Sequence, residues 1–195
     1  MNCARTGRAL GFTMVELMVG IALVTLLSML ALPAYSTFMR NSEIRTVAES
    51  VQNALQLART EAVRRNENIQ VQLPNTLDGA AVAGGTDWAV MAAAPATPTV
   101  FDQVVQRRIE PKPTTLARVG VADVVSAAVA GAGAGMPATL TFTGAGRLSV
   151  ATTVRQIDIT GSAGARRLTL VLTPAGGVRM CDPAVSLATN PQGCS

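Results

Sequence analysis

Apolar residues change their spacing along the chain, and each change marks a different predicted element. From Leu17 to Met39 there are 23 consecutive residues without a charged side chain. At about 1.5 Å per residue, a helix of this length exceeds the roughly 30 Å hydrocarbon core of a bilayer. Pro33 lies inside the run, where it predicts a kink rather than an end of the helix. The pattern therefore predicts a membrane-spanning helix that is apolar on all sides.

Beyond Pro33 the apolar residues keep a helical spacing but occupy one face only. The stripe consists of Ile44, Val47, Ala48, Val51, Ala54, Leu55, Ala58, Ala62 and Val63. Glu61 and Arg65 fall outside it, at the i,i+4 spacing of a favourable ion pair. We therefore expect one helix from Phe12 to about Arg65, on the order of 80 Å long, whose amphipathic second half packs against the rest of the chain.

The remaining sequence predicts short strands, because segments rich in Val, Ile and Thr alternate with stretches of Gly, Ala and Pro. The predicted strands are NIQVQL, DWAVM, TVFDQVVQRRI, ATLTFTG, RLSV, TVRQIDIT, RRLTLVLT and GVRM. The two longest predicted loops are AAAPATPT and AVAGAGAGMPA. Together with the helix, these elements predict an α+β fold in which a long N-terminal helix packs on an antiparallel β-sheet.

Composition excludes several kinds of chemistry. The chain has 195 residues and no histidine, so Ser-His-Asp catalysis and histidine metal sites are excluded. Neither a phosphate-binding loop nor an evident pair of catalytic carboxylates is present. Aromatic residues make up only 3% of the chain, which disfavours the stacking platforms of single-strand nucleic-acid binders. The sequence predicts a non-enzymatic protein with no cofactor and no metal.

The residues around the apolar run distinguish three interpretations of the N-terminus. Arg5 and Arg8 precede the run, so the positive-inside rule places the N-terminus in the cytoplasm and the body of the chain outside. A cleaved signal peptide fits poorly, because Leu32 and Pro33 occupy the LALPA cleavage position, where small residues are wanted. A plain signal anchor leaves Glu16 unexplained, since a carboxylate in a membrane segment costs a few kcal/mol.

The third interpretation accounts for all of these residues. The sequence RALGFTMVELMVGIALVTLLSMLALPAYS resembles the class III signal of type IV prepilins and pseudopilins. This resemblance implies a basic leader, residues 1–11, that a prepilin peptidase removes after Gly11 on the cytoplasmic side. It also implies that the new amino terminus at Phe12 is N-methylated, and that residues 12–40 remain as the transmembrane and assembly helix.

The same resemblance implies a location and a set of partners. By this resemblance, residues 41–195 are expected to form a periplasmic globular domain, built from an amphipathic helix over 41–66 and the β-sheet. The resemblance further implies a single-pass protein of the inner membrane, with its N-terminus in the cytoplasm, before it enters a pilus or pseudopilus. The implied partners are the prepilin peptidase, an inner-membrane assembly platform, and other pilins and minor pilins.

Glu16 becomes the fifth residue of the mature chain if Phe12 is the new amino terminus. The family implies that this carboxylate pairs with the α-ammonium group of a neighbouring subunit in the assembled fibre. A paired charge offsets a desolvation penalty that an unpaired charge cannot. We therefore expect Glu16 to act in assembly.

The chain contains three cysteines, Cys3, Cys181 and Cys194. Removal of the leader takes away Cys3 and leaves two cysteines thirteen positions apart, which favours one disulfide in an oxidising compartment. Closing a loop of this size stabilises a fold by roughly 3 kcal/mol on the chain-entropy model. The alternative is two unpaired cysteines in a cytosolic chain.

A more specific resemblance rests on four motifs. LQLARTEAVRRNENIQVQL is followed by the tryptophan-containing DWAVM, then LTFTGAGR, then RRLTLVLTPAGGVRMCDP, an order that resembles the GspH/FimT family of pseudopilins and minor pilins. The resemblance implies a FimT/FimU-type minor pilin that acts in assembly or priming of a type IV pilus and is incorporated into the fibre. The alternatives are a GspH-like pseudopilin of a type II secretion system and a DNA-binding minor pilin for natural transformation.

The DNA-binding alternative depends on the C-terminal arginines. DNA-binding members of the family carry a Gly-Arg-x-Arg motif before the first C-terminal cysteine, and here Gly177 stands at the place of its first arginine. Three further arginines could contribute phosphate contacts that need no sequence motif. The candidate DNA contacts are Arg147, Arg166, Arg167 and Arg179. The alternative role of these arginines is as solvated strand ends or as partners of Asp158 and Asp182, and DNA binding is the less favoured function.

Net charge adds little to this choice. The formal charge is +4, with 16 basic and 12 acidic residues, and Lys112 is the only lysine. Removing Arg5 and Arg8 with the leader leaves 14 basic residues against 12 acidic ones, or +2. Such a charge permits contact with anionic surfaces without requiring it.

Overall fold

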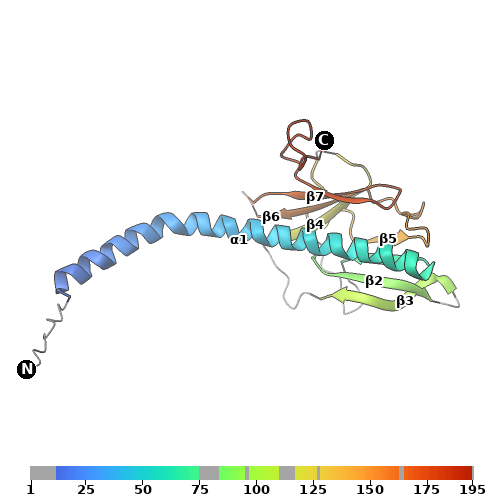
Figure 1. Ribbon diagram of the computed structural model, residues 1–195, viewed down its shortest axis with the longest axis horizontal. Coiled ribbons are helices and arrows are strands. Elements are labelled where there is room, and N and C mark those ends of the chain that lie inside the picture. Colours follow the sequence, from blue (N-terminus) through green and yellow to red (C-terminus); the bar gives the residue numbers. More distant parts are fainter. Residues whose placement is uncertain are drawn as a thin grey trace, which may run out of the picture. The chain divides into compact units, whose positions relative to one another are not determined.

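The computed structural model describes residues 12–74, 84–94, 97–109, 117–126, 128–162 and 165–194. Side chains of residues 30–34 and of Pro98 lie outside this description. Within these residues, one helix and eight strands follow each other (Figure 1). The chain divides into two compact units between Phe38 and Met39. Helix α1, Met14–Arg65, contributes residues to both units.

The C-terminal end of α1 is capped by backbone hydrogen bonds. Asn66 follows the helix with a positive φ of 54°, a conformation that asparagine tolerates better than most residues. The next amide, of Glu67, bonds back to the carbonyl oxygen of Ala62 at 3.2 Å. This left-handed turn satisfies a carbonyl group that would otherwise lack a partner. The helix therefore ends at Arg65, as the sequence pattern predicts.

The second half of α1 supplies one wall of the hydrophobic core. Eight residues of the predicted stripe are fully buried and belong to a single cluster with apolar residues of β1, β2, β4, β5, β6 and β7. Val105 of β3 and Val178 and Met180 of β8 are partly buried and pack against this cluster. The eight are Ile44, Val47, Ala48, Val51, Ala54, Leu55, Ala58 and Ala62. Val63 was also predicted to lie in the stripe, and this is wrong, because its side chain is 55% exposed. Consecutive helical residues point about 100° apart, so Val63 falls beyond the edge of the face that Ala62 buries.

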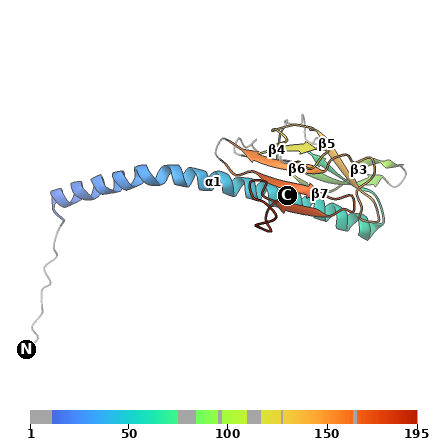
Figure 2. The same ribbon diagram turned by 90° about the horizontal axis from the view of Figure 1, so that it is seen from above.

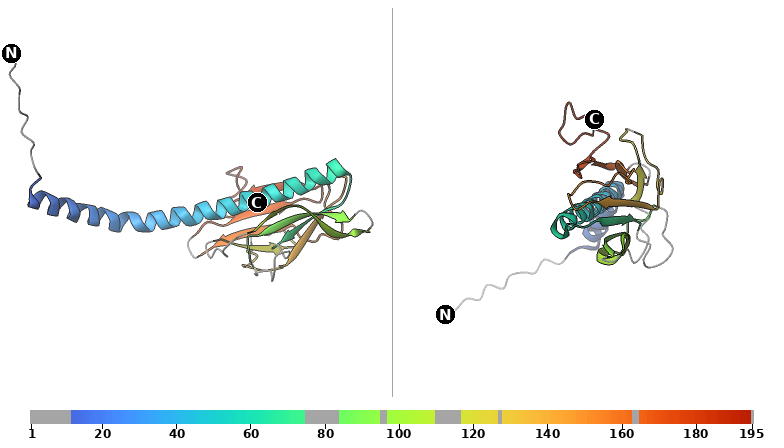
Figure 3. Two further views of the ribbon diagram at one scale, coloured as in Figure 1. Left: turned by 90° about the horizontal axis from the view of Figure 1, so that it is seen from below. Right: turned by 90° about the vertical axis from the view of Figure 1, so that its right-hand side faces the viewer.

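Eight strands form two four-stranded antiparallel sheets rather than one. The first sheet has the order β3-β2-β1-β5 and the second β4-β6-β7-β8. The strands are β1 Ile69–Leu73, β2 Trp88–Ala94, β3 Thr97–Arg108, β4 Ala117–Ala122, β5 Ala138–Phe142, β6 Gln156–Gly161, β7 Leu168–Leu172 and β8 Val178–Cys181. In Figure 1 and in the right-hand view of Figure 3, strands β2 and β3 lie below α1 and the C-terminal strands above it. The α+β class and the antiparallel pairing are confirmed.

Three local predictions differ from the structure. The segment AAAPATPT was predicted to be a loop, but β2 continues to Ala94 and β3 begins at Thr97, since cross-strand pairing extends the hairpin into this alanine-rich run. The segment RLSV was predicted to be a strand and forms only a single bridge, between Leu148 and Phe142. Strand β4 was not predicted, because a glycine in its middle weakens the strand pattern.

The outer edge of β4 is covered by the glycine-rich segment that follows it. The Val121 amide donates to the Ala134 carbonyl oxygen at 2.9 Å, and the Gly133 amide donates to the Val119 carbonyl oxygen at 2.9 Å. The predicted AVAGAGAGMPA loop therefore satisfies backbone groups that an exposed edge would leave free.

Seen from above, the C-terminal loop lies near β7 (Figure 2).

Side chains of the N-terminal unit are exposed, unlike those of the core. Every described side chain from Phe12 to Phe38 is exposed in the chain taken alone. Among the residues whose side chains are described, no helix contains a stretch long and apolar enough to cross a membrane.

Candidate functional site

Two parts of the chain carry the residues singled out by the sequence: the start of α1, and the outer face of the second sheet with the C-terminal loop. Gly11 lies outside the described residues. Phe12 precedes the helix and is 83% exposed. Because the two parts belong to different compact units, each is described separately.

The start of α1 is a side-chain cap that the sequence analysis did not identify. The Thr13 hydroxyl oxygen accepts a hydrogen bond from the Glu16 amide at 3.2 Å. Threonine followed three residues later by glutamate is the capping-box spacing, and a carboxylate in the first turn is favourable beside the positive end of the helix dipole. Glu16 therefore has a local role in starting the helix. Among the described residues, none forms an ion pair with its carboxylate.

Polar side chains within the apolar half of α1 are satisfied by their own helix. The Thr25 hydroxyl donates to the carbonyl oxygens of Ile21 and Ala22 at 3.0 and 2.9 Å. The Ser28 hydroxyl donates to the carbonyl oxygen of Val24 at 2.7 Å. Such bonds remove the cost of placing a hydroxyl group in an apolar environment.

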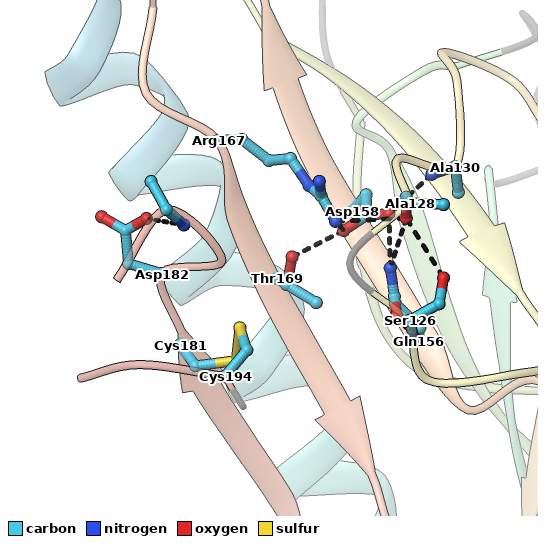
Figure 4. A network of polar contacts seen from close by, with 11 residues as sticks. Ser126, Ala128, Ala130, Gln156, Asp158, Arg167, Thr169, Cys181, Asp182 and Cys194 are labelled. Carbon is cyan, nitrogen blue, oxygen red and sulfur yellow. Dashed lines mark hydrogen bonds and ion pairs between the residues drawn. A yellow bond between two sulfur atoms is a disulfide. The ribbon is translucent and has the colours of Figure 1, made fainter. Parts of the chain in front are cut away.

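Asp158, on β6, is the centre of a buried polar network (Figure 4). Its carboxylate is fully buried. It accepts hydrogen bonds from the Ala130 amide at 2.7 Å, the Gln156 side-chain amide at 2.8 Å and the Thr169 hydroxyl at 2.6 Å. Arg167 adds an ion pair at 3.2 Å. A buried carboxylate is tolerated only with such partners, and removing them would leave an uncompensated charge.

The same network holds the loop that follows β4. The Ser126 amide donates to the Gln156 side-chain oxygen at 2.8 Å, and the Gln156 amide group donates to the Ala128 carbonyl oxygen at 3.2 Å. The Arg167 guanidinium reaches the same carbonyl oxygen at 3.3 Å. Three side chains, of Gln156, Asp158 and Arg167, therefore hold the loop at Ser126, Ala128 and Ala130, as Figure 4 shows.

A row of directly paired residues crosses the second sheet. Gly120 on β4 pairs with Asp158, Asp158 pairs with Thr169 on β7, and Thr169 pairs with Cys181 on β8. The glycine is required by a close approach, because a Cβ atom at Gly120 would lie 2.2 Å from the Gly131 carbonyl oxygen. The row connects the fastened loop at one end with the disulfide at the other.

Cys181 and Cys194 form the predicted disulfide, with their Cα atoms 5.0 Å apart. Arg179 supports the loop that the disulfide closes, since its guanidinium donates to the carbonyl oxygens of Gly193 and Cys194 at 3.1 and 3.2 Å. The covalent bond and the arginine thus hold the C-terminal loop against β8.

Arg166 connects this loop to the helix. Its guanidinium forms an ion pair with Asp182, whose side chain is only 5% exposed, and its backbone amide donates to the Asn41 side-chain oxygen at 2.9 Å. The Asp182 carboxylate also accepts a hydrogen bond from the Ala184 amide at 2.9 Å. Arg166 therefore joins the first turn of the globular unit's helix to the start of the disulfide loop.

Three of the four arginines considered for DNA contact are bonded to acceptors of the protein. Arg166, Arg167 and Arg179 each contact acceptors of the protein, and the pairing with Asp158 and Asp182 is the alternative that the sequence analysis described. Arg147 lies in the turn after β5 and is exposed. Its backbone carbonyl accepts a hydrogen bond from the Thr143 amide at 2.8 Å.

Arg59 was not identified from the sequence, although it joins three elements. Its guanidinium donates to the Gly146 carbonyl oxygen at 3.1 Å and to the Ala175 carbonyl oxygen at 3.4 Å. It therefore ties the turn after β5 and the turn between β7 and β8 to the helix. A groove of about 650 Å³ lies beside it, between α1 and the second of these turns.

Glu61 concentrates charge at the end of α1. The predicted pair with Arg65 is present at 2.8 Å, and Arg64 binds the same carboxylate at 2.6 Å. Hydrogen bonds from Arg64 and Arg65 lower the pKa of Glu61 from 4.5 to about 2. The same interaction raises the pKa of Arg64. Among the described residues, no group of three or more Cys, Asp or Glu side chains converges on a metal site.

A long N-terminal helix packed on antiparallel sheets, with an apolar and acid-bearing helix start and a C-terminal disulfide loop, is the architecture of pilin-like proteins. The family described as "Type II transport protein GspH" has a model that matches residues 47–176. The chain belongs to this family, which confirms the GspH/FimT resemblance. No curated protein matches the chain.

Two solved structures resemble the chain, and both are crystal structures of the type IV minor pilin FimU of Pseudomonas aeruginosa. The first is 19% identical, with a TM-score of 0.52, over 76% of this chain and 95% of that one. The second is 19% identical, with a TM-score of 0.46, over 72% of this chain and 94% of that one. At this level of identity, the first match establishes a shared fold.

Proposed function

We propose that this chain is a minor pilin of a type IV pilus that acts in assembly or priming and is incorporated into the fibre. A prepilin peptidase removes residues 1–11 after Gly11, Phe12 is N-methylated, and residues 12–40 anchor the chain in the inner membrane. Residues 41–195 form the periplasmic domain. Its role is structural rather than catalytic, and its partners are other pilins and the assembly platform.

The observation that carries this proposal is the start of α1. Its described side chains are mostly apolar and all exposed, the hydroxyl groups of Thr25 and Ser28 are bonded to its own backbone, and Glu16 has no ion-pair partner among the described residues. These features suit a helix covered by lipid and by other helices. Glu16 would then pair with the α-ammonium group at Phe12 of a neighbouring subunit, which offsets the cost of burying both charges.

Mass spectrometry of the protein from the producing cells tests the processing step. We expect a mature chain that begins with N-methylated Phe12 and lacks residues 1–11. A chain that retains Met1, or one that is cut after Ala34, would contradict the proposal.

Replacement of Glu16 tests the assembly step separately. Glu16→Gln keeps the size of the side chain but removes its charge, so processing should continue while incorporation into sheared fibres falls. Glu49→Gln is the matched control, because Glu49 forms an exposed pair with Arg45 on the same helix and should leave incorporation unchanged. Equal incorporation of the Glu16→Gln variant and the wild type would refute the pairing.

Membership of the GspH family favours a second candidate, a pseudopilin of a type II secretion system. Both roles require the same N-terminal helix in the membrane. They differ in the assembly that contains the chain, which is a type IV pilus in the first case and a type II secretion system in the second. Deletion of the gene should abolish surface pili if the chain is a minor pilin, and should abolish export of secreted proteins if it is a pseudopilin.

Binding of DNA is the less favoured alternative. Arg147, Arg166 and Arg179 are exposed, but the guanidinium groups of Arg166, Arg167 and Arg179 already contact acceptors within the protein. If these arginines bind phosphates, the protein should shift duplex DNA in gels, and added salt should weaken the shift. Absence of a shift at low salt, or a shift that survives replacement of all four arginines, would exclude this site.

A further inference from the structure

One end of the globular unit follows directly on the proposed membrane anchor. Asn41 comes immediately after residues 12–40, and its side-chain oxygen accepts a hydrogen bond from the Arg166 amide at 2.9 Å. Arg166 lies just before β7, and the Ala165 amide beside it donates to the Ser162 carbonyl oxygen at 3.1 Å. The end of β6 and the start of β7 therefore lie where α1 enters the globular unit.

Strand β4 brings Arg118 to the same end. Ala117 pairs with Gly161, the last residue of β6, and Arg118 pairs with Thr160. Ala117 and Val119 belong to the core, so the side chain of Arg118, which lies between them, is on the opposite face of the sheet. Arg118 is half-buried, and among the described residues none accepts a hydrogen bond from its guanidinium.

Arg108, the last residue of β3, lies beside the first turns of the helix within the globular unit. It pairs with Trp88, whose indole nitrogen donates to the Ser50 hydroxyl oxygen at 2.9 Å. A groove of about 510 Å³ lies here, and polar side chains dominate its lining. They include Thr46, Glu49, Ser50, Asn53, Gln106 and Arg108. The groove begins at Thr46, about 8 Å along the helix from Asn41.

Arginines at this end are less fully paired than the acids. Among the described residues, three arginines here have a guanidinium group without an acceptor: Arg40, Arg108 and Arg118. The described acids that do have a partner are Glu49, Asp87, Asp158 and Asp182. In the described part of this end, Glu43 is the one acid without a partner. The surface therefore has guanidinium groups available for an anion, and we call it the basic end.

We propose that the basic end binds the phosphate groups of anionic phospholipids in the membrane that anchors the chain. Arg40 and Arg118 contact headgroup phosphates, and Arg108 binds a headgroup that enters the groove, where hydroxyl and amide side chains bond its polar atoms. Guanidinium groups suit this role because they donate two parallel hydrogen bonds to a phosphate. The inference rests on the proposed membrane anchor.

Position selects a lipid among the ligands that carry phosphate. If residues 12–40 span the bilayer, its surface lies next to Asn41, and the tether gives the headgroups a high effective concentration at the basic end. Arginines on α1, β3 and β4 come from separate elements, which suits a flat surface rather than a single small anion. Binding to headgroups then holds the globular unit against the membrane before assembly, and entry into a fibre breaks this contact.

Energy transfer to the bilayer surface tests the contact with the mature full-length chain. A donor dye is attached to Ser162→Cys, at the basic end. A second labelled chain carries the dye on Ala145→Cys, in the turn that Arg59 holds at the far end of α1. The native cysteines stay in their disulfide. Each chain is reconstituted singly in vesicles of phosphatidylglycerol or phosphatidylcholine with acceptor dyes on their headgroups.

We expect the Ser162→Cys label to report a docked and an undocked population, with a higher docked-to-undocked ratio in phosphatidylglycerol. An arginine near an anionic surface contributes about fivefold, so replacing Arg108 and Arg118 together by glutamine should lower this ratio about 25-fold. The ratio in phosphatidylcholine should not change. Added sodium chloride should lower the ratio in phosphatidylglycerol.

A matched variant controls for the general loss of positive charge. Arg147→Gln removes an exposed arginine next to the Ala145 turn and should leave the ratio unchanged. Sodium phosphate at equal ionic strength should lower the ratio no more than sodium chloride does. Each variant should keep the Cys181–Cys194 disulfide on a non-reducing gel, as expected for a folded globular unit.

Four results would overturn the inference. These are equal transfer from the Ser162→Cys and Ala145→Cys labels, a ratio that is the same in both lipids, a ratio unaffected by the double replacement, and a greater loss with phosphate than with chloride, which would mark a site for free anions. Flotation of the same vesicles measures anchoring separately. A chain that floats in both lipids but shows no dependence on lipid charge rejects the headgroup contact alone, whereas a chain that does not float rejects the proposed anchor as well.

Discussion

The two halves of α1 contain similar apolar residues but obtain their stability in different ways. Leu27, in the first half, is 65% exposed, and Leu55, in the second half, is fully buried. Burial of an apolar side chain stabilises a fold roughly in proportion to the area removed from water. The second half therefore stabilises the globular unit, whereas the first half contributes only when lipid or other subunits cover it.

The strongest test of this comparison is the same truncation in each half. Leu55→Ala removes buried apolar volume and should lower the free energy of unfolding by about 2–5 kcal/mol. Leu27→Ala should leave it unchanged. Urea unfolding of the full chain in detergent, followed by circular dichroism, measures both. Equal losses for the two variants would show that the halves do not differ in this way.

The disulfide is expected to give the next effect. Replacing Cys181 and Cys194 together by alanine should lower the free energy of unfolding by roughly 3 kcal/mol. The loss should be confined to the globular unit, so the helical content of the N-terminal half in detergent should not change. A double variant as stable as the wild type would contradict the stabilising role of the C-terminal loop.

The contrast between the halves also explains which parts of the fold could be predicted. The stripe from Ile44 to Ala62 follows helical spacing because one face of the helix is buried throughout. The alanine-rich end of β2 has no such pattern of its own, and its strand conformation depends on pairing with β3. Local sequence therefore predicted the helix better than the edges of the sheets.

Site residues were predictable where spacing or residue counts determine them. The pair of Glu61 with Arg65 follows from helical spacing, and the disulfide follows from the two cysteines that remain after the leader. The sequence indicates Asp158 and Asp182 as partners of the arginines, but the pairing of β6, β7 and β8 decides which carboxylate lies beside each guanidinium. The roles of Arg59 and Gly120 depend on turns distant in the sequence, which no local signal indicates.

The cap at Thr13 provides a smaller test, at the exposed end of the helix. Thr13→Ala removes the acceptor for the Glu16 amide and should destabilise the first turn by about 1 kcal/mol. Because this turn has no core contacts, hydrogen exchange should quicken there and stay unchanged at Leu55. A fall in the global unfolding free energy would show that the halves are coupled.

The smallest effect is expected at the other end of α1, where Glu61 makes stability depend on pH. Its pKa is about 2 in the folded chain, against 4.5 without partners, so the folded state binds the proton less tightly than the unfolded state. The stabilisation is therefore complete above about pH 4.5 and is lost as the pH falls towards 2.

Urea unfolding at pH 6 and pH 3 should show a lower free energy of unfolding at pH 3 for the wild type, and this loss should be smaller in Glu61→Gln. Arg64→Ala should reduce the loss more than Arg65→Ala, because the hydrogen bond from Arg64 is the larger cause of the lowered pKa. A pH dependence identical in all four proteins would mean that Glu61 is not held by this pair, and that the end of the buried half depends on its apolar face alone.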